Sequence, residues 1–306
     1  MSELARHVSD YLALRRALGF ELEREGRELP RLVAHLEAAG AATITTELAI
    51  EWARLPQGVQ PLRWAHRLGS ARGFARYLAT IDPTTEIPPR DVFGARQRRP
   101  TPHLWTDGDV RRLLEAARDL RPPLRAATHE ALFGLLAATG MRLGEAIGLE
   151  REDVDLAEGL LTVRRTKSRR PRVLPLHPTA TAALRAYAER RDGLCPRPRS
   201  RTFLVSSVGT ALDTGDVERT VARLTTALGL RTASVRPTLH GLRHTFAVET
   251  LVAWQRSGDD AAARMATLST YLGHVDPAGT YWYLSATPEL MGLAAERLDG
   301  RFGGRS

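Results

Sequence analysis

The sequence predicts a mainly α-helical protein with a small β-sheet, divided into two domains. Apolar residues recur at helical spacing through most of the 306 residues. Patterns typical of strands are concentrated near residues 153–176. A proline-rich stretch over residues 82–103 separates a helical first part from the part that holds the strands. We therefore expect a helical domain over residues 1–81, a basic linker over 82–103 and a second domain over 104–306.

The first domain is expected to contain four helices separated by polar breaks. Their ranges are Leu4–Leu18, Leu29–Ala39, Thr46–Leu55 and Leu62–Ala79. The linker then combines prolines with three arginines. Proline blocks helix continuation, and arginine suits a phosphate backbone. The candidate DNA contacts in the linker are Arg96, Arg98 and Arg99.

The second domain opens with Thr106 as a helix cap and continues with a helix over Leu124–Ala138 that ends at Gly140. Three short strands are expected next, and a basic turn joins the last two. Helices follow from Pro178 onward, interrupted by Thr202–Val208, which can form a strand or a loop. The strands are expected over Asp153–Leu156, Leu160–Arg165 and Arg172–Leu176.

Composition excludes several classes of protein. The chain is 43% hydrophobic and 26% charged, which is typical of a folded domain and not of a disordered chain. No apolar stretch is long enough to span a membrane, and the N-terminus lacks the apolar core of a signal peptide, so we expect a cytoplasmic protein. The lone Cys195 excludes an internal disulfide and a cysteine-based metal cluster. A net charge of +9 favours a polyanionic partner such as nucleic acid.

Two segments combine polar residues in unusual patterns. In residues 138–149, Gly140 lets the chain turn and places Arg142 at a helix start, with Glu145 three residues later. A surface ion pair is the structural alternative for these two residues. The predicted hairpin 163–173 holds six cations and no acid, so an anionic partner is expected. Its candidate DNA contacts are Arg164, Arg165, Arg169 and Arg170.

Lysine usage adds a separate clue. Of the 44 lysine and arginine residues, a single one is lysine, Lys167. Arginine keeps its proton at any accessible pH, whereas lysine can release one. Lys167 is therefore a candidate for proton transfer, and a chance survivor on a solvated loop is the alternative.

Two further segments carry histidines. His240 and Arg243 lie three residues apart, and His244 lies four after His240, so they share one helical face. The histidine pair raises zinc binding, but the glutamate of the metalloprotease pattern is absent and no metal site is expected. The last segment, residues 271–283, places His274 just after a glycine, with Tyr281 and Tyr283 close behind.

Five motifs follow one another in the sequence: a Thr-Gly-x-Arg turn, a hairpin lysine, a His-x-x-Arg pair, Leu-Gly-His and a tyrosine nine residues later. In this order, the motifs resemble those of the tyrosine recombinase (phage integrase) family. The resemblance covers about residues 104–300. Residues 269–274 and 280–284 also resemble integrases of transposons and other mobile elements. By position, the resemblance implies Arg142 and Arg243 as the two catalytic arginines and Lys167 as the hairpin lysine. It also implies His240 and His274 as the two histidines, Glu145 as the supporting acid and Tyr283 as the nucleophile.

The resemblance also implies an architecture and a reaction. The first domain would be the core-binding domain and the second the α+β catalytic domain. A site-specific recombinase of this kind cleaves and rejoins DNA strands through a 3′-phosphotyrosyl intermediate and needs no metal, ATP or other cofactor. The implied partners are double-stranded DNA recombination sites and a homotetramer on DNA, with an accessory recombinase or DNA-bending protein as a further candidate.

Some features depart from the family pattern or leave alternatives open. Gly144 stands where many relatives have serine, and the stretch between Arg243 and His274 is longer than in compact relatives, so an extended helix or loop is expected there. Spacing from His274 favours Tyr283 over Tyr281 as the nucleophile. Residues 288–298 could dock on a neighbouring protomer or on their own domain. The alternative functions are a DNA-relaxing topoisomerase with the same covalent chemistry and a non-catalytic DNA-binding regulator.

Overall fold

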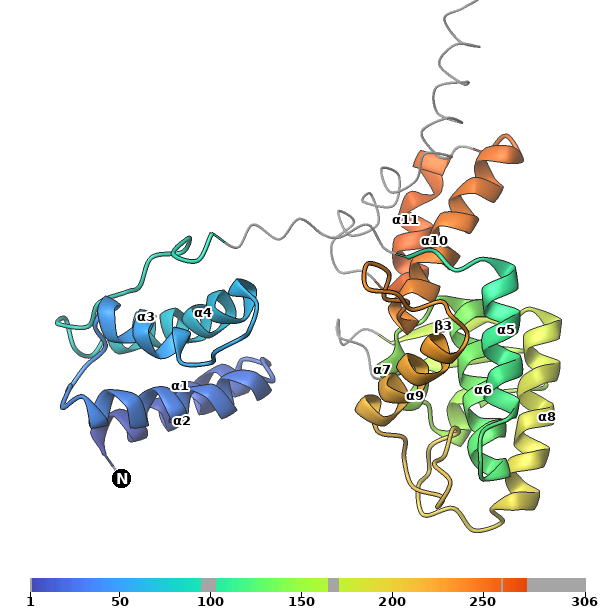
Figure 1. Cartoon of the computed structure of the whole chain (residues 1–306), viewed down its shortest axis with the longest axis horizontal. Coiled ribbons are helices and arrows are strands. Elements are labelled where there is room, and N and C mark those ends of the chain that lie inside the picture. The colour runs from blue at the N-terminus through green and yellow to red at the C-terminus, as the bar shows by residue number, and fades with distance from the viewer. Residues whose placement is uncertain (1, 95–102, 165–170, 260, 274–306) are drawn as a thin grey trace, which may run out of the picture. The chain divides into compact units, whose positions relative to one another are not determined.

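The computed structural model describes residues 2–94, 103–164, 171–259 and 261–273. The chain forms two compact units, residues 1–100 and 101–306, and each is considered by itself (Figure 1). Most described residues are helical, and a small sheet lies in the second unit. The predicted fold class, mainly α with a small β-sheet, is confirmed.

The described residues of the first unit form four helices around one apolar core. Leu29, Leu32, Trp52 and Phe74 are among its buried residues. The helix predicted from Leu29 begins earlier, at Glu23. Glu23 and Glu25 lie in its first turn, where negative charge interacts favourably with the helix dipole. The bounds are α1 Glu3–Ala17, α2 Glu23–Ala38, α3 Thr46–Arg54 and α4 Pro61–Leu78.

Residues 82–94, which the sequence places in the linker, pack against the first unit. The guanidinium of Arg72 on α4 donates hydrogen bonds to the backbone carbonyls of Pro88 at 2.8 Å and Pro89 at 2.7 Å. Val92 and Phe93 contact the apolar core of the same unit. Arg72 therefore satisfies backbone carbonyls of this proline-rich segment, and the extent of the linker over residues 82–103 stays a prediction. Residues 95–102, with Arg96, Arg98 and Arg99, lie outside the described residues.

The second unit is built around helix α6, which lies between α5 and α8 (Figure 1). An antiparallel sheet of order β1-β2-β3 pairs Leu161 with Leu174 and Val163 with Arg172. The bounds are α5 Asp107–Arg118, α6 Pro123–Thr139, α7 Leu143–Ile147, a 3₁₀ turn Arg151–Asp153, β1 Val154–Asp155, β2 Leu160–Val163, β3 Arg172–Pro175, α8 Pro178–Leu194, α9 Thr214–Ala227, α10 Leu239–Arg256 and α11 Ala261–Leu272.

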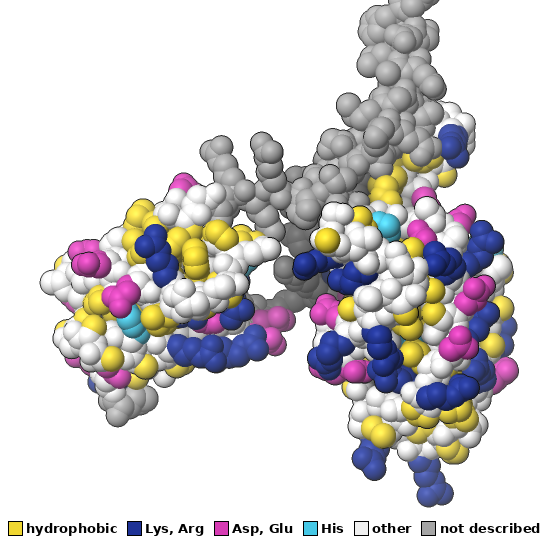
Figure 2. Space-filling model, viewed as in Figure 1, with side chains coloured by type: hydrophobic (Ala, Val, Ile, Leu, Met, Phe, Trp, Pro, Cys, Tyr) yellow, Lys and Arg dark blue, Asp and Glu magenta, His cyan; other side chains and the backbone are white. Residues whose placement is uncertain are grey.

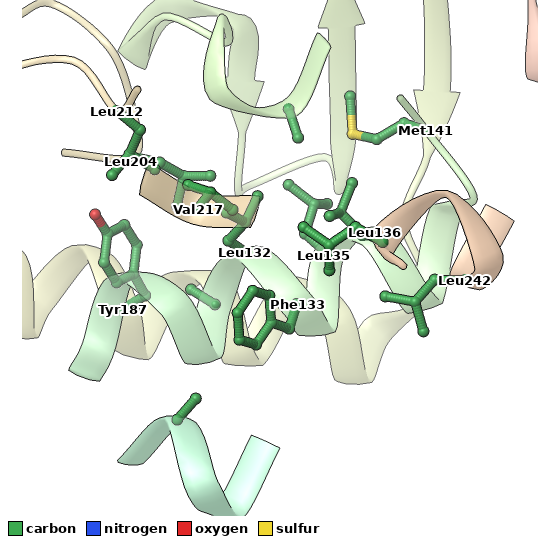
Figure 3. Close-up of a cluster of buried hydrophobic side chains, with 14 of the residues drawn as sticks. Leu132, Phe133, Leu135, Leu136, Met141, Tyr187, Leu204, Leu212, Val217 and Leu242 are labelled. Atoms are coloured by element: carbon green, nitrogen blue, oxygen red, sulfur yellow. The ribbon is translucent and has the colours of Figure 1, made fainter. Parts of the chain in front are cut away.

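Helix α6 supplies the centre of the core in this unit. Leu132, Phe133, Leu135 and Leu136 are all buried and meet side chains from other elements, including Leu242 of α10 (Figure 3). A helix that is buried on most sides is held rigidly by packing. The C-terminal end of α6, where the first candidate site residues follow, is therefore a fixed point of the structure.

Two open expectations in this unit are settled by the structure. Residues 202–208 form a loop with isolated bridges, Glu150 with Thr202 and Val205 with Ala211, and no strand. The long stretch after Arg243 continues as helix α10 to Arg256, followed by α11, and the two helices share their own apolar cluster. None of the helices in the described part of the chain is both long and apolar enough to cross a membrane.

Candidate active site

The turn after α6 begins the candidate site. Gly140 caps the helix with a left-handed backbone, at a φ of +59°. A Cβ atom at this position would lie 2.6 Å from Cδ1 of Phe246 on α10. Both the backbone conformation and the lack of space require glycine here. The turn places Arg142 at the N-cap of the short helix α7.

Arg142 and Glu145 form the predicted pair, but it does not lie on the surface. Nη1 of Arg142 donates to Oε1 of Glu145 at 2.8 Å, and the backbone N–H of Arg142 donates to Oε2 at 3.0 Å. The side chain of Glu145 is only 4% exposed, whereas that of Arg142 is 26% exposed. Nη2 of Arg142 donates to the carbonyl of Gly273 at 2.9 Å. The pair is therefore an internal support for an arginine that still reaches solvent.

A third residue, Arg172 on β3, completes this cluster. Its Nη2 donates to Oε2 of Glu145 at 2.7 Å and its Nη1 to Oε1 at 3.2 Å. Its Nε donates to the carbonyl of Tyr271 at 2.8 Å. From the sequence, Arg172 is one of the six hairpin cations and is not a predicted site residue. The signal that could have found it is the strand alternation, which places Arg172 on the same face as the buried Leu174.

Arg243 of α10 contacts two backbone segments of the cluster from inside the unit. Its side chain is buried, at 1% exposure. Nη1 donates to the carbonyl of Gly140 at 2.9 Å, and Nη2 donates to the carbonyl of Leu272 at 2.7 Å. This arginine therefore joins the end of α6 to the end of α11, and the Leu-Gly-His segment begins at that second contact.

His240 lies one turn before Arg243, near the start of α10. Thr238 caps the helix by accepting a hydrogen bond from the backbone N–H of Gly241 at 3.2 Å. The His240 and His244 rings meet edge to face, with centroids 4.5 Å apart. The residue is exposed overall, but partial desolvation of the ring and the nearby positive charges of Arg243 and Arg142 lower the pKa of His240. His240 is therefore a neutral imidazole at pH 7, which can accept a proton.

Glu145 is the acid shared by two of the arginines. Burial raises its pKa, but hydrogen bonds and positive charge from Arg172 and Arg142 outweigh burial and hold the pKa below its ordinary value. The carboxylate is therefore ionised at neutral pH. The cluster contains three guanidinium groups and one carboxylate, so its net charge is positive. A positive site suits an anion such as a phosphodiester.

Several candidate residues lie outside the part of the chain that the structure describes. Lys167, His274 and Tyr283, with the alternative Tyr281, lie outside the described residues, as do Arg165, Arg169 and Arg170. The described cluster nevertheless contains residues close to these segments. Gly273 directly precedes His274, and Arg172, the first residue of β3, lies five positions after Lys167 in the sequence.

Arg164, the described member of the predicted DNA contacts, forms an ion pair with buried Asp153. Figure 2 shows other arginines (dark blue) spread over the visible face of the second unit, with acidic side chains (magenta) between them. In two examples, Arg151 binds Asp192 at 2.5 Å and Arg118 binds Glu130 at 2.7 Å. Much of the surface charge on this unit is therefore balanced locally.

The sequence raised zinc binding by the two histidines of α10 and predicted that they hold no metal. His240 and His244 contact each other through their rings. Within the described ranges, no group of three or more His, Cys, Asp or Glu side chains is arranged to hold a metal ion. The described cluster consists of Arg142, Arg172 and Arg243 with the single carboxylate of Glu145.

Known proteins share both the sequence and the fold. A protein of Sinorhizobium fredii described as an integrase/recombinase, y4rB, is 44% identical over 314 aligned residues that cover 100% of both chains. Tyrosine recombinase XerC of Methylobacterium nodulans is 30% identical over 279 residues, which cover 86% of this chain and 81% of the relative. The structure of the Tn1549 transposon integrase in complex with transposon right end DNA covers 95% of this chain and 99% of that chain, with a TM-score of 0.68 at 18% identity.

The family comparison matches the unit that holds the arginine cluster. The model of the phage integrase family matches residues 105–289. This range contains the described cluster and the undescribed segments with Lys167, His274 and Tyr283. The chain therefore belongs to the phage integrase family and is a tyrosine site-specific recombinase.

Proposed function

We propose that this recombinase cuts each DNA strand with Tyr283 as the nucleophile, around a phosphate held by the cluster of Arg142 and Arg243. The observation that carries the proposal is the contact of Arg142 with both Glu145 and Gly273. It joins the turn with the first arginine to the residue directly before His274. Such a junction is what a site made from distant sequence motifs needs.

The phosphodiester carries a negative charge that repels nucleophiles and grows in the transition state. The guanidinium of Arg142 has five N–H donors, of which the contacts with Glu145 and Gly273 use two. Its partial exposure gives an incoming phosphate access to the group. Arg142 would therefore hold the non-bridging oxygens. The family resemblance assigns Arg243 and His274 as further donors of the clamp. Arg243 is 1% exposed and its Nη1 and Nη2 bind backbone carbonyls, so it would also hold the clamp in position from inside the unit.

The cutting step needs one proton removed and one supplied. The phenol of Tyr283 has an ordinary pKa near 10, so it needs a proton acceptor and nearby positive charge. Neutral His240 would take the phenolic proton while the oxygen bonds to phosphorus. The bond from phosphorus to the 5′ oxygen breaks, and Lys167 would protonate that oxygen. The products are a 3′-phosphotyrosyl link and a free 5′ hydroxyl.

Rejoining follows from the same chemistry. The bond energy stays in the phosphotyrosyl ester, so a 5′ hydroxyl from another strand can attack it and release the tyrosine without ATP. Exchange between two DNA sites needs several copies of the enzyme, and the family resemblance favours four protomers on two sites. The complex of the Tn1549 integrase with transposon right end DNA supports DNA as the substrate, and double-stranded recombination sites are the form proposed here. An accessory recombinase or DNA-bending protein is a further candidate partner.

The particular role in the cell is a finer proposal. The motifs at residues 269–274 and 280–284 favour an integrase of a transposon or another mobile element. Recombinases of this family often act next to their own coding region. The DNA that flanks the gene is therefore the first candidate for the target site.

Trapping of the covalent intermediate tests this proposal. In flanking DNA with a nick just downstream of the cleavage point, cutting releases the short fragment that carries the free 5′ hydroxyl. Rejoining is then prevented, so the protein stays attached to the 3′ phosphate and shifts on a denaturing gel. The parent and Tyr281→Phe should form this adduct. Tyr283→Phe should form none while still binding the same DNA, because it lacks only the hydroxyl. An adduct with Tyr283→Phe and none with Tyr281→Phe would make Tyr281 the nucleophile.

A second assay distinguishes recombination from the two alternative functions, DNA relaxation and DNA binding without catalysis. A supercoiled plasmid with two copies of the flanking site should yield recombinant product. Relaxation without recombinants would indicate a topoisomerase. An unchanged plasmid, with specific DNA binding but no adduct, would indicate a non-catalytic regulator.

A further inference from the structure

We propose that Arg172 is a positioning residue, which holds Glu145 in place and balances its charge so that Arg142 keeps its own charge for the phosphate. The inference deepens the proposed function and rests on it, because its readout is DNA cleavage. None of the family motifs found in the sequence includes Arg172. Its contacts in the structure are the basis of the inference.

The geometry of Arg172 is that of a fork on a carboxylate. Its two terminal nitrogens bind the two oxygens of Glu145 at 2.7 and 3.2 Å. The side chain is 9% exposed, so water competes little for these bonds. Guanidinium matches a carboxylate through two parallel hydrogen bonds, which a lysine cannot make. Arg172 therefore fixes both the position and the rotation of the carboxylate.

The same guanidinium fixes the backbone before His274. Its Nε binds the carbonyl of Tyr271 at 2.8 Å. Gly273 has a φ of +67°, and a Cβ atom there would lie 2.8 Å from Nη1 of Arg172. The glycine thus lets the arginine pack directly on the turn whose carbonyl binds Arg142. One side chain supports both contacts of Arg142.

Charge gives Arg172 a second role. A buried carboxylate that faced Arg142 alone would neutralise it and weaken its attraction for phosphate. With Arg172 on the other side, Glu145 is shared between two cations. The three groups together carry one net positive charge. Glu145 can then orient Arg142 without cancelling its charge.

Two routes from Arg172 to the reaction can be separated. It begins β3, shortly after Lys167 in the sequence, so its loss could also disturb the lysine. The hydrogen bonds of its guanidinium, however, go to Glu145 and Tyr271. We therefore expect Arg172 to act on the clamp of the non-bridging oxygens and not on protonation of the leaving oxygen.

Single-turnover cleavage of the nicked flanking DNA, with protein in saturating excess, tests the inference. Arg172→Gln should bind DNA as tightly as the parent and cleave about 100-fold more slowly, the loss expected when a clamp is misplaced by about 1 Å. Arg172→Lys keeps the charge but loses the fork and should also cleave slowly. Adding Glu145→Gln to Arg172→Gln should restore part of the rate, because it removes the uncompensated carboxylate.

Arg191→Lys is the matched control. Arg191 is also a buried arginine of the second unit, at 1% exposure, and it donates to the carbonyl of Phe203 at 2.7 Å, in the loop after α8. Its variant should lose thermal stability as the Arg172 variants do. At a temperature where all variants are folded, it should cleave at the parental rate.

The outcomes separate this inference from the proposed function. If the parent forms no adduct, the proposed function fails. If the parent cleaves and Arg172→Gln cleaves equally fast, the positioning role is wrong. The role in charge balance is wrong if Glu145→Gln further slows the Arg172→Gln protein. A substrate with sulfur in place of the 5′ bridging oxygen should not rescue Arg172→Gln, and rescue would show that Arg172 acts through Lys167 instead.

Discussion

Arg142 donates a hydrogen bond of 2.9 Å to the carbonyl of Gly273, which lies 131 positions later in the sequence. This contact joins the turn after α6 to the end of α11. The buried side chain of Arg243 joins the same two segments, because it donates hydrogen bonds to the carbonyls of Gly140 and Leu272. Two arginines therefore hold together backbone segments that sequence motifs define separately.

Replacing Gly273 with alanine should disrupt this junction. The left-handed backbone at φ +67° costs a non-glycine residue about 1–2 kcal/mol. The new Cβ would also press on the guanidinium of Arg172 from 2.8 Å. Because Arg142 depends on the Gly273 carbonyl, Gly273→Ala should cleave nicked DNA about 100-fold more slowly than the parent. Single-turnover cleavage and thermal unfolding measure the two effects.

Gly229 provides the control for backbone strain. Its φ is +71°, and a Cβ atom at this position would have no other group within 4 Å. Gly229→Ala should lose similar stability and cleave at the parental rate. Equal cleavage by Gly273→Ala and Gly229→Ala would show that the contact with Gly273 does not position Arg142.

The titration of His240 is a second measurable property. Partial desolvation and the charges of Arg243 and Arg142 lower its pKa and favour the neutral form, so the NMR midpoint of its ring protons should lie below 6.5. The imidazole then loses its ability to accept a proton only as the pH falls through that midpoint. Arg142→Ala should move the midpoint upward, since it removes a cation. A midpoint above 6.5 in the parent would contradict this electrostatic account.

Local sequence patterns predicted the parts of the site that depend on neighbouring residues. Gly140 ends α6 as expected, because a left-handed cap needs glycine. The three-residue spacing of Arg142 and Glu145 gave their pairing. The strands at 153–176 also follow from short-range alternation. The roles of Lys167, His274 and Tyr283 remain predictions from the family resemblance.

Contacts between distant segments were beyond such patterns. Arg172 reads as one more cation of a basic hairpin until tertiary structure brings it onto Glu145, 27 residues earlier. The burial of Glu145 likewise depends on elements that surround α7. In the first unit, Arg72 binds a proline-rich segment whose composition is typical of a linker. Long-range pairing of side chains, and not local propensity, decides all three.

Chelation should leave DNA cleavage unchanged. In the proposed reaction, arginines supply the positive charge and the ester conserves the bond energy, so no step requires a metal ion. Cleavage of nicked DNA in buffer with excess EDTA should match cleavage without it. Loss of activity that added zinc restores would instead indicate a metal site at His240 and His244.

The sharpest prediction concerns Lys167, because composition and family resemblance point to it independently. Lys167→Arg keeps the positive charge but removes a group that can release a proton at accessible pH. It should therefore bind DNA as tightly as the parent and cleave it much more slowly. Binding is measured by gel shift and cleavage by single turnover on the nicked substrate. Normal cleavage would make the lone lysine a chance survivor of an arginine-rich composition.

A 5′ bridging sulfur locates the defect in the reaction. A thiolate leaves without protonation, so the sulfur substrate should restore most of the rate lost in Lys167→Arg. It should not restore Arg142→Ala, because Arg142 acts on the non-bridging oxygens and those are unchanged by the sulfur. If Lys167→Arg is slow and sulfur does not help, Lys167 positions the phosphate, and the proton for the leaving oxygen comes from another group. The pair of variants thus separates proton transfer from charge stabilisation within one active site.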